Sequence, residues 1–503
     1  MASRMINAID RHKVDGFPTA FSLPLDASKV AEVLSVSTGF KAIMGGAFPN
    51  HNISTENLNK EDIQAILDQT KDAPVKLEKA HEVKVAFMVF QQVKDGMSPV
   101  EIIGACPQSN NESSAFTEDI LGAAKTAVID AVESGGGQVA LLNFAVDGVS
   151  CEREDVMSSI SKFLDGVEDH TGAVDNKHNV KNDRYHVAGG SCAPTIGELV
   201  VDSDLLRQAE VPEELLKWKD FSSDKLAEDF FSFKTLKKLV DGIESGLVDG
   251  LSGDAGALAC TLFFMRLHLH AVNGLGVPAR HRALYLWLSM IWFTTLSGVD
   301  ITPKRNIVSE TISNVFLALR SDVIKLHSCT SEPAEHGFGN IRKIFREFDC
   351  ADFCSLSDRE QIRLNQMFAG NLKAAKEIHG YGATFEDYIE ALKAQGLEGG
   401  PCMINYSDNA APVAEQLWPH VKKIIDQAER MIVPLLRLIG VDQGEMSPFC
   451  KSFETTKELL RAYISYCPKT FSYKGQSGEM EGNAGTMALK LTAVRGKERR
   501  EML

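Results

Sequence analysis

The chain has 503 residues and a formal net charge of -15 at pH 7, with 44% hydrophobic and 24% charged residues. Its length exceeds the usual size of one hydrophobic core, so we expect one large domain with an insertion, or two to three domains. The hydrophobic and charged fractions are typical of globular proteins and exclude a wholly disordered, fibrous or membrane class. The negative charge repels a polyanion on average, so any nucleic-acid site must be local, metal-assisted or inactive.

The cysteines and the apolar runs indicate which cellular compartment the chain suits and whether it crosses a membrane. The 10 cysteines are scattered without a CxxC pair, which supports neither a disulfide framework nor a zinc module and favours a reducing intracellular compartment. The longest apolar run without a charge, ALYLWLSMIWFTTL at 283–296, has 14 residues. Because about 20 residues are needed to span a bilayer, this run predicts a buried helix, and we expect no membrane partner.

The first 190 residues alternate strand-like and helix-like patterns, which predicts an α/β fold with a mixed sheet flanked by helices. A first apolar strand, TAFSLPLD, is expected to end at Asp26, and a paired strand with a TG turn follows it. The segment 82–92 predicts the next strand. The apolar stretch QVALLNFAVD predicts a buried central strand that ends at Asp147.

Helical patterns separate and follow these strands. The segment 116–137 predicts a helix with Thr117 as its N-cap and a glycine triplet as its stop. A short strand then leads into a helix that begins at Asp175. From about 195 to 325 the pattern is helical throughout, which predicts a large all-α insertion in the sheet domain, and the C-terminal region is also predicted to be helical.

The chain is therefore expected to contain six segments. They are an N-terminal tail (1–15), the first part of the sheet core (16–194), the all-α insertion (195–325), the completion of the core (326–398), a C-terminal helical region (399–467) and a polar tail expected to be flexible (468–503).

Two aspartates at predicted strand ends are candidates for chemistry. If their strands are neighbours, Asp26 and Asp147 come together at the rim of the sheet. Paired carboxylates raise one another's pKa unless a cation lies between them, so such a pair implies either a shared proton or a divalent metal. Taken singly, each aspartate more often just begins a turn.

A third acid lies in the stretch TSEPAEHGFGNIRKIFREF at 330–348. With about 100° per residue, Glu335 lies beside Phe338 at the edge of an apolar stripe, whereas Glu332 points the opposite way. The residues 331–333 are fully explained as a helix start. Glu335 is not explained in that way and is expected to face whatever the helix packs on.

The order of these motifs resembles the RNase H-like catalytic core of cut-and-paste DNA transposases of the DDE superfamily, and it is most similar to the P element and THAP-type family. The stretches LDASKV, VDGVSCE and TSEPAEHGFGNIR resemble the family's first aspartate, its CDGxxxN-like stretch and its TSxxxExxFxxxR helix. The resemblance covers 16–348. It implies that Asp26, Asp147 and Glu335 form the catalytic, metal-binding triad, and it places Arg342 at the arginine of the last motif.

A fourth likeness is VDNKHNVKNDR, which resembles the family's DxxHxxKxxRN stretch. It implies that Asp175, His178, Lys181 and Asn182 bind phosphate or steady the acidic rim. A helix cap followed by a solvated polar turn fits the same spacing equally well.

The resemblance implies divalent-metal-dependent cleavage and strand transfer of DNA. Two Mg2+ or Mn2+ ions would be held by the three acids, with Asp26 as the bridging ligand. DNA, in the form of transposon ends, is the implied partner, the nucleus is the implied compartment, and the oligomeric state, including a homo-oligomer, is left open.

The sequence also departs from the family. It has no recognisable THAP zinc module and no phosphate-binding glycine loop in the helical insertion, so GTP binding is not supported. These departures fit a truncated or domesticated copy. The alternative is a non-catalytic, transposase-derived scaffold for protein partners, which the charge of -15 favours, whereas the presence of all three acids favours the enzyme.

Overall fold

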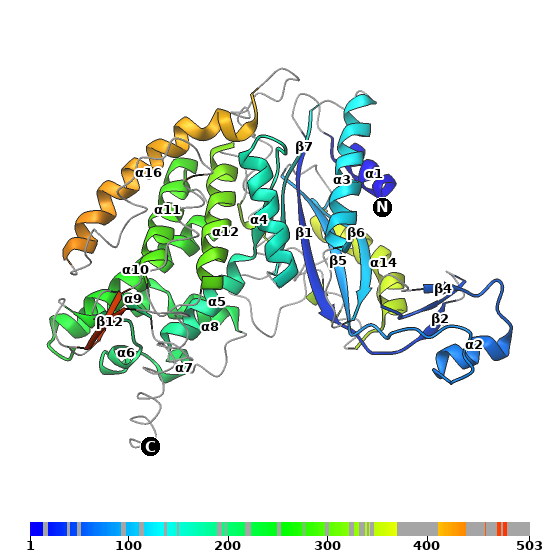
Figure 1. Cartoon of the computed structure of the whole chain (residues 1–503), viewed down its shortest axis with the longest axis horizontal. Coiled ribbons are helices and arrows are strands. Elements are labelled where there is room, and N and C mark those ends of the chain that lie inside the picture. The colour runs from blue at the N-terminus through cyan, green and yellow to red at the C-terminus, as the bar shows by residue number, and fades with distance from the viewer. Residues whose placement is uncertain are drawn as a thin grey trace. The chain divides into compact units, whose positions relative to one another are not determined.

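The structure is a computed structural model of the whole chain (Figure 1). The residues that it describes are 1–13, 19–37, 41–47, 52–91, 97–109, 115–134, 138–147, 150–188, 194–196, 199–216, 223–248, 253–274, 277–296, 301–320, 326–330, 338–339, 342, 347–369, 411–438, 458, 470–473 and 476–479.

The described residues form two compact units. The first contains Met1–Asp155 and the described residues from His327 to Ala369, and the second contains Val156–Leu326 and the described residues from 411 onward. The elements within the first unit are α1 (Ala2–His12), β1 (Thr19–Lys29), β2 (Ser35–Ser37), β3 (Ala42–Met44), β4 (Asn52–Ser54), α2 (Lys60–Leu67), β5 (Glu82–Phe90), β6 (Val100–Gln108), α3 (Ala115–Glu133), β7 (Val139–Val146), all but the first residue of η1 (Leu326–Cys329) and α14 (Cys350–Phe368).

A five-stranded sheet forms the framework, with the strand order β6-β5-β1-β7-β8, where β8 is Thr171–Val174. Strand β1 pairs antiparallel with β5 and parallel with β7, and β5 pairs antiparallel with β6. The mixed sheet flanked by helices, which the sequence predicts, is confirmed. Strand β6, helix α1 and helix α4 (Ser150–Leu164) were not predicted.

The two faces of the sheet are covered by different helices. Strand β5 is buried on both faces, as expected for a strand in the interior of a sheet. Its odd-numbered side chains, Val83 to Val89, pack in one core cluster with side chains of α14. On the opposite face, the ring of Phe90 stacks on His12 of α1 at 4.0 Å between centroids. Helix α14 begins at a capping box in which Asp349 and Asp352 exchange side-chain and backbone hydrogen bonds.

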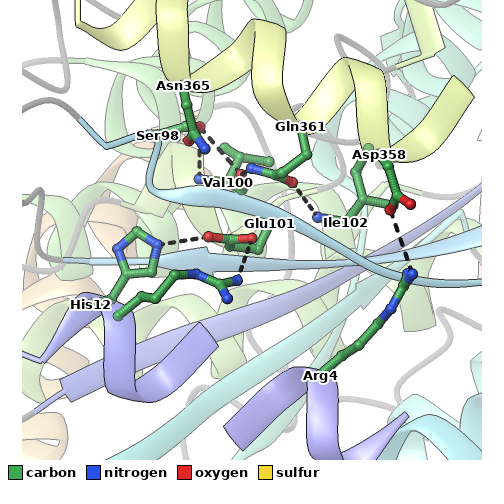
Figure 2. Close-up of polar contacts among 10 residues, drawn as sticks. Arg4, His12, Ser98, Val100, Glu101, Ile102, Asp358, Gln361 and Asn365 are labelled. Atoms are coloured by element: carbon green, nitrogen blue, oxygen red, sulfur yellow. Dashed lines mark hydrogen bonds and ion pairs between the residues drawn. The ribbon is translucent and has the colours of Figure 1, made fainter. Parts of the chain in front are cut away.

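Strand β6 is an edge strand, and side chains of α14 bind its backbone (Figure 2). The side-chain amide of Gln361 donates to the carbonyl of Val100 at 2.8 Å and accepts from the N–H of Ile102 at 2.9 Å. Asn365 accepts from the N–H of Ser98 at 3.1 Å. These side chains satisfy backbone groups that an edge strand otherwise leaves for another strand.

Two local predictions differ from the structure. The strand expected after Asp26 is a small separate antiparallel sheet, in the order β2-β3-β4, which packs with α2 around Leu34, Ile43 and Ile66. Thr117 is not the N-cap of its helix, because α3 already begins at Ala115 and Thr117 is buried within it. The hydroxyl of Thr117 is thus in the core rather than at a helix start.

The second unit is mainly helical, as the sequence predicts for the insertion. Long helices α10, α11 and α12 pack in sequence order, and α16 packs along α11 and α12 (Figure 1). Its elements are the later part of α4, β8, α5 (Asn176–Val187), β9 (Thr195–Ile196), β10 (Leu199–Val200), α6 (Asp204–Gln208), α7 (Glu213–Leu216), α8 (Asp224–Phe230), α9 (Phe233–Glu244), α10 (Asp254–Asn273), α11 (Ala279–Thr295), α12 (Ile301–Arg320), α16 (Val413–Leu438), β11 (Thr470–Tyr473) and β12 (Gln476–Glu479).

One described helix, α10, is long and apolar enough to cross a membrane by length and composition. However, 67% of its apolar window is buried inside the protein. The run at 283–296 lies in α11 and its C-cap, where nearly every side chain is buried, as predicted. Both helices therefore have the burial expected of core helices in a helical bundle.

Candidate functional site: an acidic pair on neighbouring parallel strands

The parallel pairing of β1 and β7 brings Asp26 and Asp147 to the same level. Leu23 pairs with Phe144 and Pro24 with Ala145. Two residues further along each strand are Asp26 in β1 and Asp147, which directly follows β7. Residues at the same level of neighbouring parallel strands point to the same face, and such strands are about 4.8 Å apart. The two aspartates, 121 residues apart in the sequence, are therefore neighbours on one face of the sheet.

The surroundings of the two aspartates differ. Asp147 is half-buried and lies just beyond the end of its strand, as predicted. Asp26 was predicted to end its strand, and this was wrong: β1 continues to Lys29 because Ser28 and Lys29 still pair with the antiparallel neighbour β5. Asp26 is only 7% exposed, and one of its carboxylate oxygens accepts from the N–H of Ala27 at 2.8 Å.

The third predicted acid, Glu335, lies outside the described residues, but two residues that follow it are described. The ring of Phe338 meets the ring of Phe87 edge-on at 6.3 Å. The guanidinium of Arg342 donates to the hydroxyl of Ser28 at 2.5 Å. Because Ser28 is two residues from Asp26, both point to the same face of the sheet. The described residues that follow Glu335 thus lie on the face that carries the aspartate pair.

A second anchor holds the late part of the chain on this same face. The hydroxyl of Ser22 donates to the Cys329 sulfur at 3.2 Å, and the side-chain amide of Gln91 reaches the same sulfur at 3.5 Å. The amide of Asn143 donates to the backbone carbonyl of Cys329 at 2.9 Å. These contacts join β1 and β7 to the segment that leads toward Glu335, and the sequence pattern did not predict them.

The end of the sheet near the aspartate pair is rich in carboxylates. Burial raises the pKa of Glu82; Lys84 lowers it, while Asp147 and Glu152 raise it further. Burial, followed by the charge of Glu118, raises the pKa of Asp155 to about 6. Carboxyl groups that are crowded and desolvated in this way are typical of sites that bind a cation or transfer a proton.

One buried ion pair crosses this region. The ammonium group of Lys84 in β5 pairs with the carboxylate of Glu152 in α4, and each side chain is only 5% exposed. Sequence reasoning missed both residues as site residues. The available signal was a lone lysine inside the apolar strand EVKVAFMVF, because a buried lysine needs a partner.

The other predicted site residues lie on α5 and its N-cap. Asp175 is the N-cap and is buried, His178 is half-buried, and Asn182 is exposed. The ammonium group of Lys181 pairs with Asp224 of α8 at 2.9 Å. These four residues belong to the second unit, whereas the aspartate pair belongs to the first.

A buried polar cluster in the second unit fixes α5. The amide of Asn179 donates to Glu310 of α12 at 2.6 Å, and the imidazole of His268 lies 2.9 Å from the other oxygen of Glu310. Burial, and then the charge of Glu310, raises the pKa of Asp183 well above its usual value. This cluster joins α5 to the helical bundle, and it gives His268 a structural role.

The donor set can be tested against a divalent metal. Among the described residues, no group of three or more His, Cys, Asp or Glu side chains is arranged to hold a metal ion. Asp26 and Asp147 supply two hard oxygen donors, which Mg2+ and Mn2+ prefer. A third donor would have to come from outside the described residues, where Glu335 lies. Asp26 and Asp147 can therefore supply two of the ligands of such a site.

Comparisons with known proteins bear on the fold. No protein-family model matches the sequence, and no curated protein matches it. The chain is similar to the solved structure of a Drosophila P element transposase strand transfer complex, with a TM-score of 0.50 and 14% sequence identity over 73% of this chain and 81% of that chain. At this identity the likeness shows the fold alone. The RNase H-like fold class, with its helical C-terminal region, is confirmed, and the likeness is to a P element rather than specifically to a THAP-type protein.

Proposed function

We propose that this chain is a transposase-like protein that cuts and joins DNA phosphodiester bonds with divalent metal ions held by Asp26, Asp147 and Glu335. The single observation that carries the proposal is the parallel register that makes Asp26 and Asp147 neighbours on one face of an RNase H-like sheet. The described residues Phe338 and Arg342 support it, because the segment that follows Glu335 contacts this same face.

The residues present suggest a division of roles. Asp26, on the more central strand of the pair and nearly buried, is suited to bridge two ions, while Asp147, half-buried and directly after the end of β7, is suited to bind one. Mg2+ or Mn2+ would supply the activation of a water or 3' hydroxyl and the stabilisation of the leaving oxygen. Arg342, exposed and hydrogen-bonded to Ser28 beside this face, would contact a DNA phosphate.

DNA is the proposed partner and the nucleus the proposed compartment. The structure similar to this chain is described as a strand transfer complex, which supports DNA as the substrate class. The residues of α5 now have different weights in this proposal. Lys181 already has Asp224 as an ionic partner, so the exposed Asn182 is the better candidate for a phosphate contact.

A specific observation favours a second candidate function. The net charge of -15 opposes binding of a polyanion, so the same fold could serve as a scaffold for protein partners without cutting DNA. This candidate retains the aspartate pair as a relic of the enzyme. It differs from the first in one measurable respect, since a scaffold needs no metal.

The experiment that tests the proposal is a Mg2+ and Mn2+ titration against nicked and branched duplex DNA. We expect cleavage or strand transfer by the wild-type chain and a loss of at least about a hundredfold in Asp26→Asn and Asp147→Asn. Asp130→Asn, an exposed aspartate on α3, is the matched control and should retain full activity. Equal activity in Asp147→Asn and the wild type would identify the signal as contamination. A folded but inactive wild type would favour the scaffold.

A further inference from the structure

Two exposed phenylalanine rings lie beside one arginine in the second unit. Phe233, in the first turn of α9, is 55% exposed, and Phe263 of α10 is 40% exposed. The guanidinium of Arg266 lies 5.5 Å from the centre of the Phe233 ring. Because Phe263 precedes Arg266 by three residues on α10, these two side chains are neighbours on the helix surface. Both rings therefore adjoin the same cation.

The aromatic surface continues from α10 to α11, with which α10 packs (Figure 1). His270 follows Arg266 by one turn, and the centroid of its ring is 6.3 Å from that of Tyr285 on α11. The Tyr285 centroid is in turn 6.1 Å from that of His281. Every one of these side chains is exposed or half-buried. We call the set the aromatic stripe, and its members are Phe233, Phe263, Arg266, His270, Tyr285 and His281.

The charges along the aromatic stripe are positive. Arg266 forms no hydrogen bond or ion pair with any residue that the structure describes, and its Nε is buried without a partner. Lys234 and Arg280, which adjoin the end members of the stripe in the sequence, are exposed cations with no paired carboxylate among the described residues. Burial, followed by the charges of Arg266 and Arg282, lowers the pKa of His270, so its ring is neutral at pH 7.

Exposed rings interleaved with cations are typical of surfaces that bind single strands of nucleic acid. The rings stack on unpaired bases, and arginine adds cation–π and phosphate contacts. A duplex cannot use such rings in this way, because its base faces are already stacked on one another. On a chain with a net charge of -15, cations without a paired carboxylate mark the part of the surface that a polyanion can approach.

We propose that the aromatic stripe binds single-stranded DNA, with unpaired bases stacked on its exposed rings and phosphates held by Arg266 and the two cations at its ends. This inference rests on the proposed function for the choice of DNA, because an enzyme that transfers DNA strands handles ends that leave the duplex. It needs neither metal ions nor the aspartate pair, which belongs to the first unit.

The test measures binding of fluorescein-labelled oligothymidylate to the full-length protein by fluorescence anisotropy, with EDTA present so that no metal ion contributes. The strand has about 16 nucleotides, the upper end of known single-strand site sizes. Phe233→Ala should weaken binding about tenfold, as expected for the loss of one stacked base, and Phe233→Trp should stay within about threefold of the wild type. Arg266→Gln should weaken binding and lower the slope of log Kd against log salt by about 0.7, as expected for one lost phosphate contact.

Leu247→Ala and Lys225→Gln are the matched controls, because Leu247 is 59% exposed in the same unit and Lys225 is an exposed lysine of α8 outside the stripe. Neither should change the affinity. An abasic strand of the same length should bind at least about tenfold more weakly than oligothymidylate, because it has phosphates but no bases to stack. Circular dichroism checks that each variant is folded. If Phe233→Ala does not fold, Phe263→Ala decides the matter in its place.

The outcomes separate the aromatic stripe from the proposed function. Weaker binding by Phe233→Ala and Arg266→Gln, with unchanged controls, supports the stripe. It is overturned if the wild type binds no oligothymidylate, if the abasic strand binds equally well, or if the folded stripe variants keep full affinity. A poly-glutamate peptide that binds as tightly as the DNA also overturns it and identifies an acidic protein as the partner. If the stripe binds single strands but the wild type cuts no DNA with Mg2+ or Mn2+, the proposed cleavage is wrong and the stripe stands.

Discussion

Carboxylates at two places on the sheet of the first unit have opposite pKa shifts. At edge strand β6, Glu101 accepts from Arg11 at 2.9 Å and pairs with His12 at 3.1 Å (Figure 2). Although burial alone would raise its pKa, hydrogen bonds from His12 and Arg11 hold the pKa of Glu101 below its usual range. Around Lys84, by contrast, carboxylates outnumber the buried cation, and the pKa values of Glu82 and Asp155 are raised.

This difference distinguishes a carboxylate whose ionised form stabilises the fold from carboxylates whose ionised form destabilises it. A lowered pKa means that folding favours the ionised carboxylate, so Glu101 contributes stability above its unfolded pKa and loses it as the pH falls through its folded pKa. A raised pKa has the opposite sign: ionised Glu82 and Asp155 cost stability at neutral pH. Perturbed carboxyl groups of this kind occur both at functional sites and in structural ion-pair networks.

The largest expected effect on stability is at Glu101, whose charge is balanced by Arg11 and His12. Glu101→Ala leaves buried His12 and half-exposed Arg11 without their carboxylate, and it should lower the free energy of unfolding by about 3 kcal/mol. Urea unfolding followed by circular dichroism measures this change. Asp358→Ala is the control, because Asp358 pairs with Arg4 at 3.5 Å with both side chains exposed (Figure 2), and it should cost under about 0.5 kcal/mol. Equal costs would contradict the contrast between the two pairs.

The next effect concerns the backbone of the same edge strand. Gln361→Ala removes both hydrogen bonds to β6 and should cost about 2 kcal/mol, since each bond contributes about 1 kcal/mol. Gln361→Glu keeps the acceptor for the N–H of Ile102 but loses the donor to the carbonyl of Val100, so its cost should be at least as large as that of one bond. Hydrogen exchange at Ile102 should rise in Gln361→Ala and much less in Gln361→Glu. Unchanged exchange in both variants would mean that β6 is held by its pairing with β5 alone.

Removing a carboxylate from the group around Lys84 should raise, rather than lower, the free energy of unfolding. Because the pKa of Asp155 is raised to about 6 in the folded chain, its ionised form lowers stability fully above pH 6 and not at all below its unfolded pKa near 4. Asp155→Asn should therefore raise the free energy of unfolding at pH 8 by about 1 kcal/mol, after allowance for the partial exposure of this side chain. The gain should vanish at pH 4. A gain that is the same at both pH values would show that charge is not its cause.

Whether a feature of this sheet could be predicted from the sequence depends on how far apart in the sequence the residues that form it are. The apolar runs that end near Asp26 and Asp147 predict two strands, and the resemblance to a known family supplied the expectation that they are neighbours. The structure pairs the two strands in parallel up to Pro24 and Ala145, two residues before each aspartate. Strand runs of this kind are local patterns, which explains why they could be recognised.

The residues that the sequence did not reveal act over long separations. Lys84 and Glu152 are 68 residues apart, and Gln361 is 261 residues from Val100, to which it donates. Neither contact leaves a periodic pattern in the sequence. The same reason explains why Asp224 was not foreseen as the partner of Lys181. Asp26 was placed at a strand end because LPLDASK turns polar there, yet pairing with β5 overrides that local signal and extends the strand to Lys29.

The smallest expected effect tests whether Asp147 lowers or raises the free energy of unfolding. Asp147→Asn removes one of the negative charges that raise the pKa of Glu82, so the free energy of unfolding should stay equal or rise by about 0.5 kcal/mol at pH 8. Urea unfolding with and without 5 to 10 mM Mn2+, roughly the excess needed to saturate a weak site, measures both terms. Mn2+ should stabilise the wild type and not the variant, because a ligand that binds only the folded state raises its stability. A loss of more than about 1 kcal/mol in Asp147→Asn without metal would mean that Asp147 is a structural carboxylate like Glu101, and that the two ends of the sheet do not differ in kind.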